Sequence, residues 1–319
     1  MSALPLTIAT RSYDFILPLV LGDVATEGLD LTVVRGFRIL ERVLTDPAIH
    51  GGESSFSRYV QRLARGDRAL VGLPAFVMRE FRHRNFFVRR DSGLRDLKDL
   101  QGTRIGLDGW PNSGNTWSRG LLREAGVPLD SVRWVVGAVN PGEAAPPADA
   151  LPAGVTMAPA GRTLREMLVA GELDVLVVAW APAGFYESDS PIVRLFPDFR
   201  RVEREYYRRT GLFPAHHIVV LRRDVVDAHP EVVPRLYTAL SRAREHAVKQ
   251  RLLLHESSPW QLAELEEEAA LLGPGFEFYG ARANRAMIAA FCAEQSAQGL
   301  VPRPIEPDEV FAEFERLAR

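Results

Sequence analysis

Segments with strand-like and helix-like patterns alternate through the middle of this chain, and this alternation restricts the possible fold more than any other feature. A helical pattern at 94–100 precedes a short apolar run at 103–107, and a second helical pattern at 114–125 precedes another apolar run at 132–136. Gly126 follows the second helix directly, as is typical of a glycine that ends a helix. Strands joined through helices form a mostly parallel sheet with helices packed on it. The sequence therefore predicts an α/β fold.

The chain has 319 residues, which is long enough for two domains. Two predicted strands, 85–88 and 218–221, are each followed by two arginines and an aspartate. If these strands lie side by side, the chain leaves one lobe at the first strand and returns at the second. We therefore expect lobe I to comprise residues 1–90 and 215–319, including a series of C-terminal helices, and lobe II to comprise residues 91–214. Small molecules often bind in a cleft between such lobes.

Composition and charge exclude several classes of protein. The chain is 46% hydrophobic and 25% charged with a formal net charge of −2, which favours neither a disordered chain nor a nucleic-acid-binding protein. It contains no apolar run of membrane-spanning length and no signal-peptide pattern at its start. Its one cysteine, Cys292, lies among apolar residues and cannot form an internal disulfide. We therefore expect a cytoplasmic protein that binds neither nucleic acid nor membrane, and the sequence leaves a homo-oligomer open.

Two places in the sequence have the chemistry to bind a small anion without a metal. Arg82, His83 and Arg84 form a basic cluster directly before a predicted strand, and residues 113–116 open a helix whose first backbone amides are free. Cationic side chains and helix N-termini both attract carboxylates. The competing interpretation is a solvated basic cluster and an ordinary helix cap. We therefore predict a carboxylate site, with these structural roles as the alternative.

Many short segments follow one another along the chain in a distinctive order. They include 27–31 (EGLDL), 52–59 (GESSFSRY), 73–76 (LPAF), 81–83 (FRH), 99–106 (DLQGTRIG), 117–122 (WSRGLL), 171–174 (GELD), 195–198 (LFPD) and 210–217 (TGLFPAHH). No single segment is specific, but in their number and order they resemble the 4,5-dihydroxyphthalate decarboxylase family. The similarity runs from about residue 6 to residue 224, and the predicted C-terminal helices fit the family in length.

The resemblance implies a fold like that of type II periplasmic solute-binding proteins, with two α/β lobes, two crossover strands and a ligand in the cleft. It also implies a carboxy-lyase of aromatic compound metabolism, which removes one carboxylate from a hydroxylated aromatic acid such as a dihydroxyphthalate. Residues 108–115 depart from the family's pattern, which leaves the substrate open. Two alternatives also stay open: a solute-binding protein that captures a small aromatic or carboxylate ligand without chemistry, and another lyase or hydrolase on the same scaffold.

Removal of a carboxylate from an aromatic ring requires an acid that protonates the ring carbon. His83 and His217 are the candidates, because imidazole titrates near neutrality. They would lie close together if the two predicted strands pair. Glu53 could take up a proton or orient a phenol, but it could equally satisfy the N-terminus of the helix that follows it. A solvated charge at position 83 and a core histidine at position 217 are the competing interpretations.

Further residues are candidates for binding the substrate. Arg11 and Tyr13 follow the first predicted strand, where ligands of parallel sheets usually bind. Helix capping and turn formation are the alternatives for the serines, asparagine and threonine, and core packing is the alternative for the tryptophan. Nucleotide-binding glycine patterns and zinc-binding helix motifs are absent, so we expect neither a cofactor nor a metal. The candidates are Arg11, Tyr13, Ser54, Ser55, Arg82, Ser113, Asn115, Thr116, Arg119 and Trp180.

Overall fold

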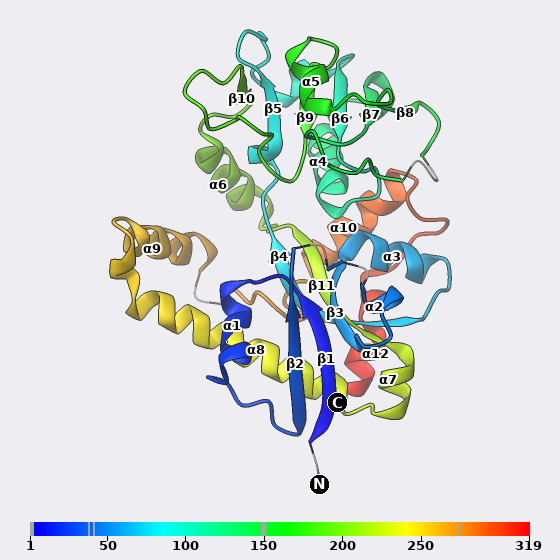
Figure 1. Ribbon diagram of the computed structural model, residues 1–319, viewed down its shortest axis with the longest axis vertical. Coiled ribbons are helices and arrows are strands. Elements are labelled where there is room, and N and C mark those ends of the chain that lie inside the picture. The colour runs from blue at the N-terminus through cyan, green and yellow to red at the C-terminus, as the bar shows by residue number, and fades with distance from the viewer. Residues whose placement is uncertain (1–2, 38, 41, 148–150, 274) are drawn as a thin grey trace. The chain divides into compact units, whose positions relative to one another are not determined.

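A computed structural model describes residues 3–37, 39–40, 42–147, 151–273 and 275–319. The chain divides into two compact units (Figure 1). Unit 1 comprises the residues up to Arg79 and those from Ala215 onward, and unit 2 comprises Glu80–Pro214. The boundary lies at residue 79, earlier than the expected boundary at residue 90. The reason is that strand β5 (Phe86–Arg89) pairs with strands of unit 2.

Unit 1 is built on a five-stranded sheet in the order β2-β1-β3-β11-β4. Strand β1 pairs in parallel with β2 and β3, whereas β11 pairs antiparallel with β3 on one side and β4 on the other. The strands β1, β3 and β11, which carry several candidate residues at or near their ends, are therefore neighbours in the sheet. The strands are β1 (Leu4–Thr10), β2 (Leu29–Arg35), β3 (Gly51–Ser55), β4 (Leu70–Arg79) and β11 (Ala215–Arg222).

The expected pairing of residues 85–88 with residues 218–221 is wrong. β5 lies in the sheet of unit 2, and β11 pairs with β3 and β4. The chain leaves unit 1 after β4 and returns to it at β11, so the two crossover strands are this antiparallel pair. The physical reason is length and burial: β4 and β11 have ten and eight residues, most of them buried, and bury more apolar surface together than four-residue β5 could.

Unit 2 contains a six-stranded sheet in the order β10-β5-β9-β6-β7-β8. The neighbours from β9 to β8 pair in parallel, and β5 pairs antiparallel with β9 and β10. The predicted alternation of helices and parallel strands is thereby confirmed. The further strands are β6 (Arg104–Leu107), β7 (Arg133–Val136), β8 (Val155–Met157), β9 (Val175–Val177) and β10 (Ile192–Arg194), and the helices of this unit are α4 (Ser113–Glu124), α5 (Leu164–Val169) and α6 (Phe199–Thr210).

The C-terminal helices belong to unit 1 and pack on its sheet through aromatic side chains. The ring of Phe56 in α3 stacks on that of Phe291 in α10, with centroids 4.6 Å apart, and both Phe56 and Phe76 contact Phe311. No helix in the described part of the chain is long and apolar enough to cross a bilayer. The helices of unit 1 are α1 (Leu17–Leu21), α2 (Arg42–Thr45), α3 (Phe56–Ala64), α7 (Arg223–Ala228), α8 (Val232–Leu253), α9 (Gln261–Leu272), α10 (Arg285–Ala297), α11 (Pro307–Val310) and α12 (Ala312–Leu317).

Gly52 allows β1 and β3 to approach closely. Its φ is +152°, and a Cβ atom there would lie 2.1 Å from the carbonyl oxygen of Ala9. We expect Gly52→Ala to lower the free energy of unfolding by about 3 kcal/mol, because β3 must move away from β1. Gly66→Ala is the matched control: Gly66 also has a positive φ, but a Cβ there meets nothing within 4 Å. Urea unfolding measures both, and equal losses would contradict the steric explanation.

Candidate functional site

The buried carboxylate of Glu53 is the centre of a hydrogen-bonded cluster in unit 1. Its Oε1 lies 2.5 Å from Nδ1 of His217 and accepts a hydrogen bond of 2.8 Å from the hydroxyl of Tyr13. Its Oε2 accepts hydrogen bonds from the backbone amide of Arg11 at 2.9 Å and from the hydroxyl of Thr10 at 3.3 Å. One carboxylate on β3 therefore has four donors, three from the end of β1 and the residues after it and one from β11.

Sheet geometry explains why these side chains meet. In the antiparallel pair of β3 and β11, Glu53 lies opposite Val219, so His217 is its diagonal neighbour on the same face. His216 takes the other face by strand alternation, as the sequence predicted. β1 pairs with β3 in parallel, so the residues that follow β1 lie at the edge of the sheet where β3 also ends. Two of them, Arg11 and Tyr13, were predicted from this position in the chain.

The surroundings of Glu53 keep it ionised. Burial alone would raise its pKa, but the hydrogen bond and charge of His217, followed by the amide and guanidinium of Arg11, outweigh burial and hold the pKa below its usual range. An ionised carboxylate only accepts hydrogen bonds, so Nδ1 of His217 carries the proton in this contact. The other ring nitrogen of His217, Nε2, has no hydrogen-bond partner among the described residues. The side chain of His217 is 11% exposed, whereas that of Glu53 is fully buried.

Tyr13 points its hydroxyl at Glu53. Burial, and then the charge of Glu53, raise the pKa of Tyr13, so the phenol stays protonated and donates. Its ring stacks on Phe15 with centroids 5.0 Å apart. The structure thus gives this side chain a role in holding the carboxylate. Thr10 was not predicted from the sequence, although its position at the end of the first strand, directly before Arg11, is a signal that could have identified it.

The serines that follow Glu53 have structural roles in unit 1. Ser55 is the N-cap of α3, and its Oγ accepts a hydrogen bond of 3.4 Å from the amide of Arg58. Ser54 is buried and, by strand alternation, takes the opposite face of β3 from Glu53. Of the two, Ser55 thus fits the capping alternative considered for it, and its role in substrate binding stays a prediction, as does that of Ser54.

In unit 2, the buried guanidinium of Arg82 lies on the first turn of α4. Its Nε donates to Oγ of Ser118 at 3.2 Å, and its Nη1 donates to Oε2 of Glu80 at 3.1 Å. A Cβ atom at Gly114 would lie 2.9 Å from Cζ of Arg82. A cation and the positive end of the α4 helix dipole are therefore close together within this unit. Glu80 was missed from the sequence, although it precedes the basic cluster by only two residues.

Three other predicted residues stabilise the loop before α4. Asn115 donates from Nδ2 to Asp108 and to the carbonyl oxygen of Gly109, at 2.7 Å in both cases, and Thr116 donates to the carbonyl oxygen of Asn112 at 3.1 Å. The guanidinium of Arg119 lies 4.0 Å from the ring centroid of Trp110 and donates to that residue's carbonyl oxygen. Ser113 is buried in the first turn of α4, and Trp180 is 55% exposed.

His83 has surroundings that differ from those of His217. It begins a short 3-10 helix (His83–Asn85), and its ring packs against Tyr206 and Phe196 with centroids 5.2 and 5.8 Å away. Its Nδ1 is buried and has no hydrogen-bond partner among the described residues. Burial, and then the charges of Arg209 and Arg84, lower the pKa of His83 to about 4. At neutral pH this imidazole is uncharged.

The low pKa of His83 predicts a loss of stability in acid. As pH falls from 6.5, the unfolded chain takes up a proton at this histidine while the folded chain does so only near pH 4. The contribution is present above pH 6.5 and is lost towards pH 4, amounting to about 3 kcal/mol in full. We expect urea unfolding of His83→Gln to show a flatter pH dependence over this range than the parent protein. His229→Gln is the control, and identical profiles for the parent and His83→Gln would contradict the assignment.

In the part of the chain that the structure describes, no group of three or more histidine, cysteine, aspartate and glutamate side chains is placed to hold a metal ion. Glu53 and His217 meet in unit 1, and His83 belongs to unit 2. Within unit 1, Glu53 and His217 form a carboxylate–imidazole pair.

Comparison with solved structures defines the class of fold. The chain is similar to the periplasmic aliphatic sulphonate binding protein SsuA from Escherichia coli, with a TM-score of 0.54, 14% identity and 97% of each chain covered. It is also similar to a Candida albicans protein described as exhibiting the generic periplasmic binding protein fold, with a TM-score of 0.51, 13% identity and coverage of 98% and 94%. The protein thus has the periplasmic-binding-protein fold that was predicted.

Comparison of sequences defines the family, although no family model matches the chain. The chain is 31% identical over 330 residues to 4,5-dihydroxyphthalate decarboxylase from Comamonas testosteroni, covering 98% of this chain and 97% of that protein. It is 32% identical over 214 residues to the protein of the same name from Pseudomonas putida, covering 65% of this chain and 83% of that protein. The chain belongs to the 4,5-dihydroxyphthalate decarboxylase family, and the predicted resemblance is confirmed.

Proposed function

We propose that this protein is a carboxy-lyase that decarboxylates a hydroxylated aromatic acid such as a dihydroxyphthalate. Two relatives are named for that activity, and one of them matches nearly the full length of the chain. The observation within the molecule that supports it best is the contact of 2.5 Å between Glu53 and Nδ1 of His217. That contact orients the imidazole and leaves its second nitrogen open for proton transfer.

In the proposed reaction, the protonated imidazole of His217 donates the proton on Nε2 to the ring carbon that bears the carboxylate. A phenolic hydroxyl of the substrate supplies electron density to the ring during this step. The bond between the ring carbon and the carboxylate then breaks, its electron pair restores the aromatic ring, and carbon dioxide leaves. His217 regains a proton from water. The Glu53 carboxylate balances the imidazolium charge before the transfer and fixes the orientation of the ring.

Binding of the substrate's carboxylates is proposed for the cationic groups of each unit. In unit 1, the guanidinium of Arg11 lies beside the cluster, with its Nε 3.7 Å from Oε1 of Glu53. In unit 2, the guanidinium of Arg82 lies against the first turn of α4, which includes Ser113 and where the helix dipole favours an anion. Substrate contacts from Asn115, Thr116, Arg119 and Trp180 stay predictions, as do the roles of the two units as lobes.

Release of carbon dioxide tests this function. The protein is incubated with a panel of hydroxybenzoates and hydroxylated phthalates, and binding is followed in parallel by calorimetry. We expect release of one carbon dioxide per molecule from at least one hydroxylated phthalate, and none from phthalate without a hydroxyl group. Tight binding of these acids without turnover would instead identify a solute-binding protein, and turnover without carbon dioxide would identify another lyase or a hydrolase.

The proposal also includes a cytoplasmic location and a small aromatic carboxylate as ligand. The only cysteine, Cys292, is buried, and burial raises its pKa to about 12, so it is a packed thiol. Such a thiol is consistent with a reducing compartment. Fractionation of cells that produce the protein, with an antibody against it, would test the location.

Tyr13 should position Glu53. We expect Tyr13→Phe to lower kcat about 10-fold, because Glu53 loses one hydrogen bond but keeps its contacts with His217 and the amide of Arg11. KM should change less than 2-fold, since the hydroxyl of Tyr13 donates to the carboxylate of Glu53 and not to the substrate in this proposal. Steady-state kinetics of carbon dioxide release measure both constants. A large rise in KM with unchanged kcat would show that the hydroxyl binds the substrate.

A further inference from the structure

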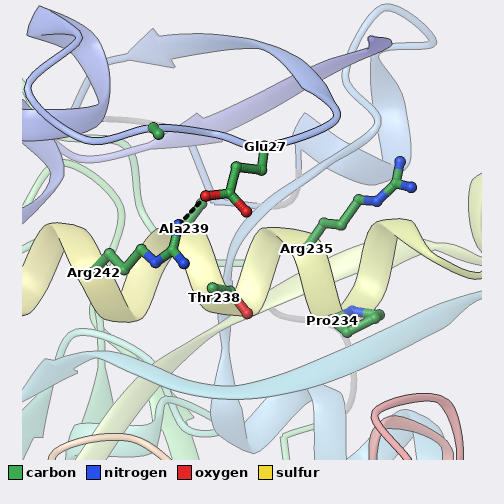
Figure 2. A pocket seen from close by; sticks show the side chains of 7 residues that line it. Glu27, Pro234, Arg235, Thr238, Ala239 and Arg242 are labelled. Carbon is green, nitrogen blue, oxygen red and sulfur yellow. Dashed lines mark hydrogen bonds and ion pairs between the residues drawn. The ribbon is translucent and has the colours of Figure 1, made fainter. Parts of the chain in front are cut away.

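Helix α8 is held to unit 1 by its first half. Figure 2 shows the side chains of α8 that line a small pocket, where Nη1 of Arg242 pairs with Glu27 at 2.9 Å. Arg235 donates to the carbonyl oxygen of Gly28 at 3.3 Å. Leu236 and Leu240 on the same half are buried. The first part of this helix therefore has its partners within the chain.

The end of α8 keeps one ion pair within unit 1, between Arg251 and Asp14, but its large apolar side chains are exposed, as is Leu262 of α9. Figure 1 shows the end of α8 and the whole of α9 extending past α1, and no described residue of α9 is buried. We name residues 248–272 the α8–α9 arm. Trp260 is 72% exposed and Leu253 is 68% exposed. The large apolar side chains exposed on the arm are Val248, Leu252, Leu253, Leu254, Trp260 and Leu262.

A concentration of exposed apolar side chains marks a surface that another molecule covers. Monomeric proteins rarely expose contiguous apolar patches of more than a few hundred Å². The arm carries nearly half of the large exposed apolar side chains in the described chain, within only fifteen residues. Leu21 of α1, which packs against α8, adds to them. A stable interface buries roughly 800 Å² on each partner, so a contact between two proteins needs several such side chains together.

The charges of the arm identify the molecule that covers it. Helix α9 carries four glutamates within residues 264–268, whereas the end of α8 carries Lys249 and Arg251, of which Arg251 already pairs with Asp14 of the same chain. One arm thus presents an acidic helix and a basic helix end. A two-fold axis that places α9 of one copy against the end of α8 of another pairs opposite charges twice, and a second copy of this chain supplies both halves of that match.

We propose that the α8–α9 arm is the contact between two copies of this chain, arranged about a two-fold axis. Leu253, Trp260 and their neighbours form its apolar centre, and the glutamates of α9 face Lys249 of the other copy. This inference is independent of the proposed reaction, because none of these side chains contacts Glu53 or His217 in the described hydrogen bonds. It concerns assembly alone.

The first test is the mass of the protein in solution. We expect sedimentation velocity to give twice the mass of the chain at micromolar concentration. Leu253→Glu and Trp260→Glu should each raise the dissociation constant at least 100-fold, since each buries a charge in the apolar centre. Tyr186→Glu is the matched control, because this side chain is 81% exposed but belongs to unit 2. A monomeric parent protein at 50 µM, or dimers that survive both arm substitutions, would overturn the proposal.

The second test uses reversed charges and does not depend on disrupting the apolar centre. Lys249→Glu alone, and Glu266→Lys with Glu268→Lys in a second variant, should each weaken self-association about 10-fold. Mixed in equal amounts, the two variants should associate with each other about as tightly as the parent protein does. In that mixed dimer each acidic helix again meets a basic one. Circular dichroism checks that both variants are folded. Failure of the mixture to restore association would exclude the two-fold arrangement.

Discussion

Replacing Glu53 with glutamine is expected to lower kcat for decarboxylation about 1000-fold. Glutamine has nearly the same shape, but it carries no charge and places an amide donor among the groups that now donate to Glu53. The imidazole of His217 then loses both its orientation and the charge that balances its protonated form. Oε1 accepts from Tyr13 and contacts Nδ1 of His217, so an amide group at that place would meet two donors.

The measurement is single-turnover release of carbon dioxide, with substrate affinity determined separately by calorimetry. Affinity should change less than the rate, because the carboxylate is buried behind the imidazole. Thr10→Val is the matched control, since it removes only a hydrogen bond of 3.3 Å to the other oxygen of Glu53. We expect this control to lose less than 10-fold in kcat. A Glu53→Gln protein within 3-fold of the parent rate would contradict the role of the pair.

Replacing His217 with asparagine is expected to lower kcat by a similar factor of about 1000, because the proton donor is removed. Asparagine keeps a donor near Glu53, so the carboxylate stays paired and the strand pairing of β3 with β11 is preserved. His83→Asn provides the comparison within the same chain. That imidazole is uncharged at neutral pH and packs against Tyr206, so we expect its loss to lower kcat less than 10-fold.

Both histidines were candidates for the proton donor from the sequence. The rates of the two variants at saturating substrate show which of them has this role. Near-normal turnover by His217→Asn, together with a large loss in His83→Asn, would assign the acid to unit 2. Thermal unfolding of both variants shows whether a loss of rate reflects a loss of fold.

Much of the fold follows from patterns that are local in the sequence. The alternation of helical and apolar segments predicted the parallel sheet of unit 2, because each helix and each short strand has its own period and its own end signals. The prediction of Glu53 and His217 as candidate residues also rested on local sequence, because each is a titratable residue next to the end of a predicted strand or the start of a predicted helix. Their contact could not be read in this way, since it depends on the register between β3 and β11, which are 160 residues apart in the chain.

The errors have the same physical origin. The strands at 85–88 and 218–221 were paired because similar charged residues follow them, but burial and length pair β11 with β4 instead. The hydrogen bond from Tyr13 to Glu53 was not predicted either, and substrate binding by Tyr13 stays a prediction. A sequence shows which side chains can donate, whereas the acceptor is determined by packing between distant segments.

The most direct test of the proposed chemistry is a double-mutant cycle on Glu53→Gln and His217→Asn, measured as the rate of carbon dioxide release from saturating substrate. If the two side chains act as one proton-donating pair, the double variant will be about as slow as either single variant, within a few-fold. If the two losses multiply, so that the double variant is slower by about a million-fold, Glu53 and His217 act independently and the account of a coupled pair is wrong.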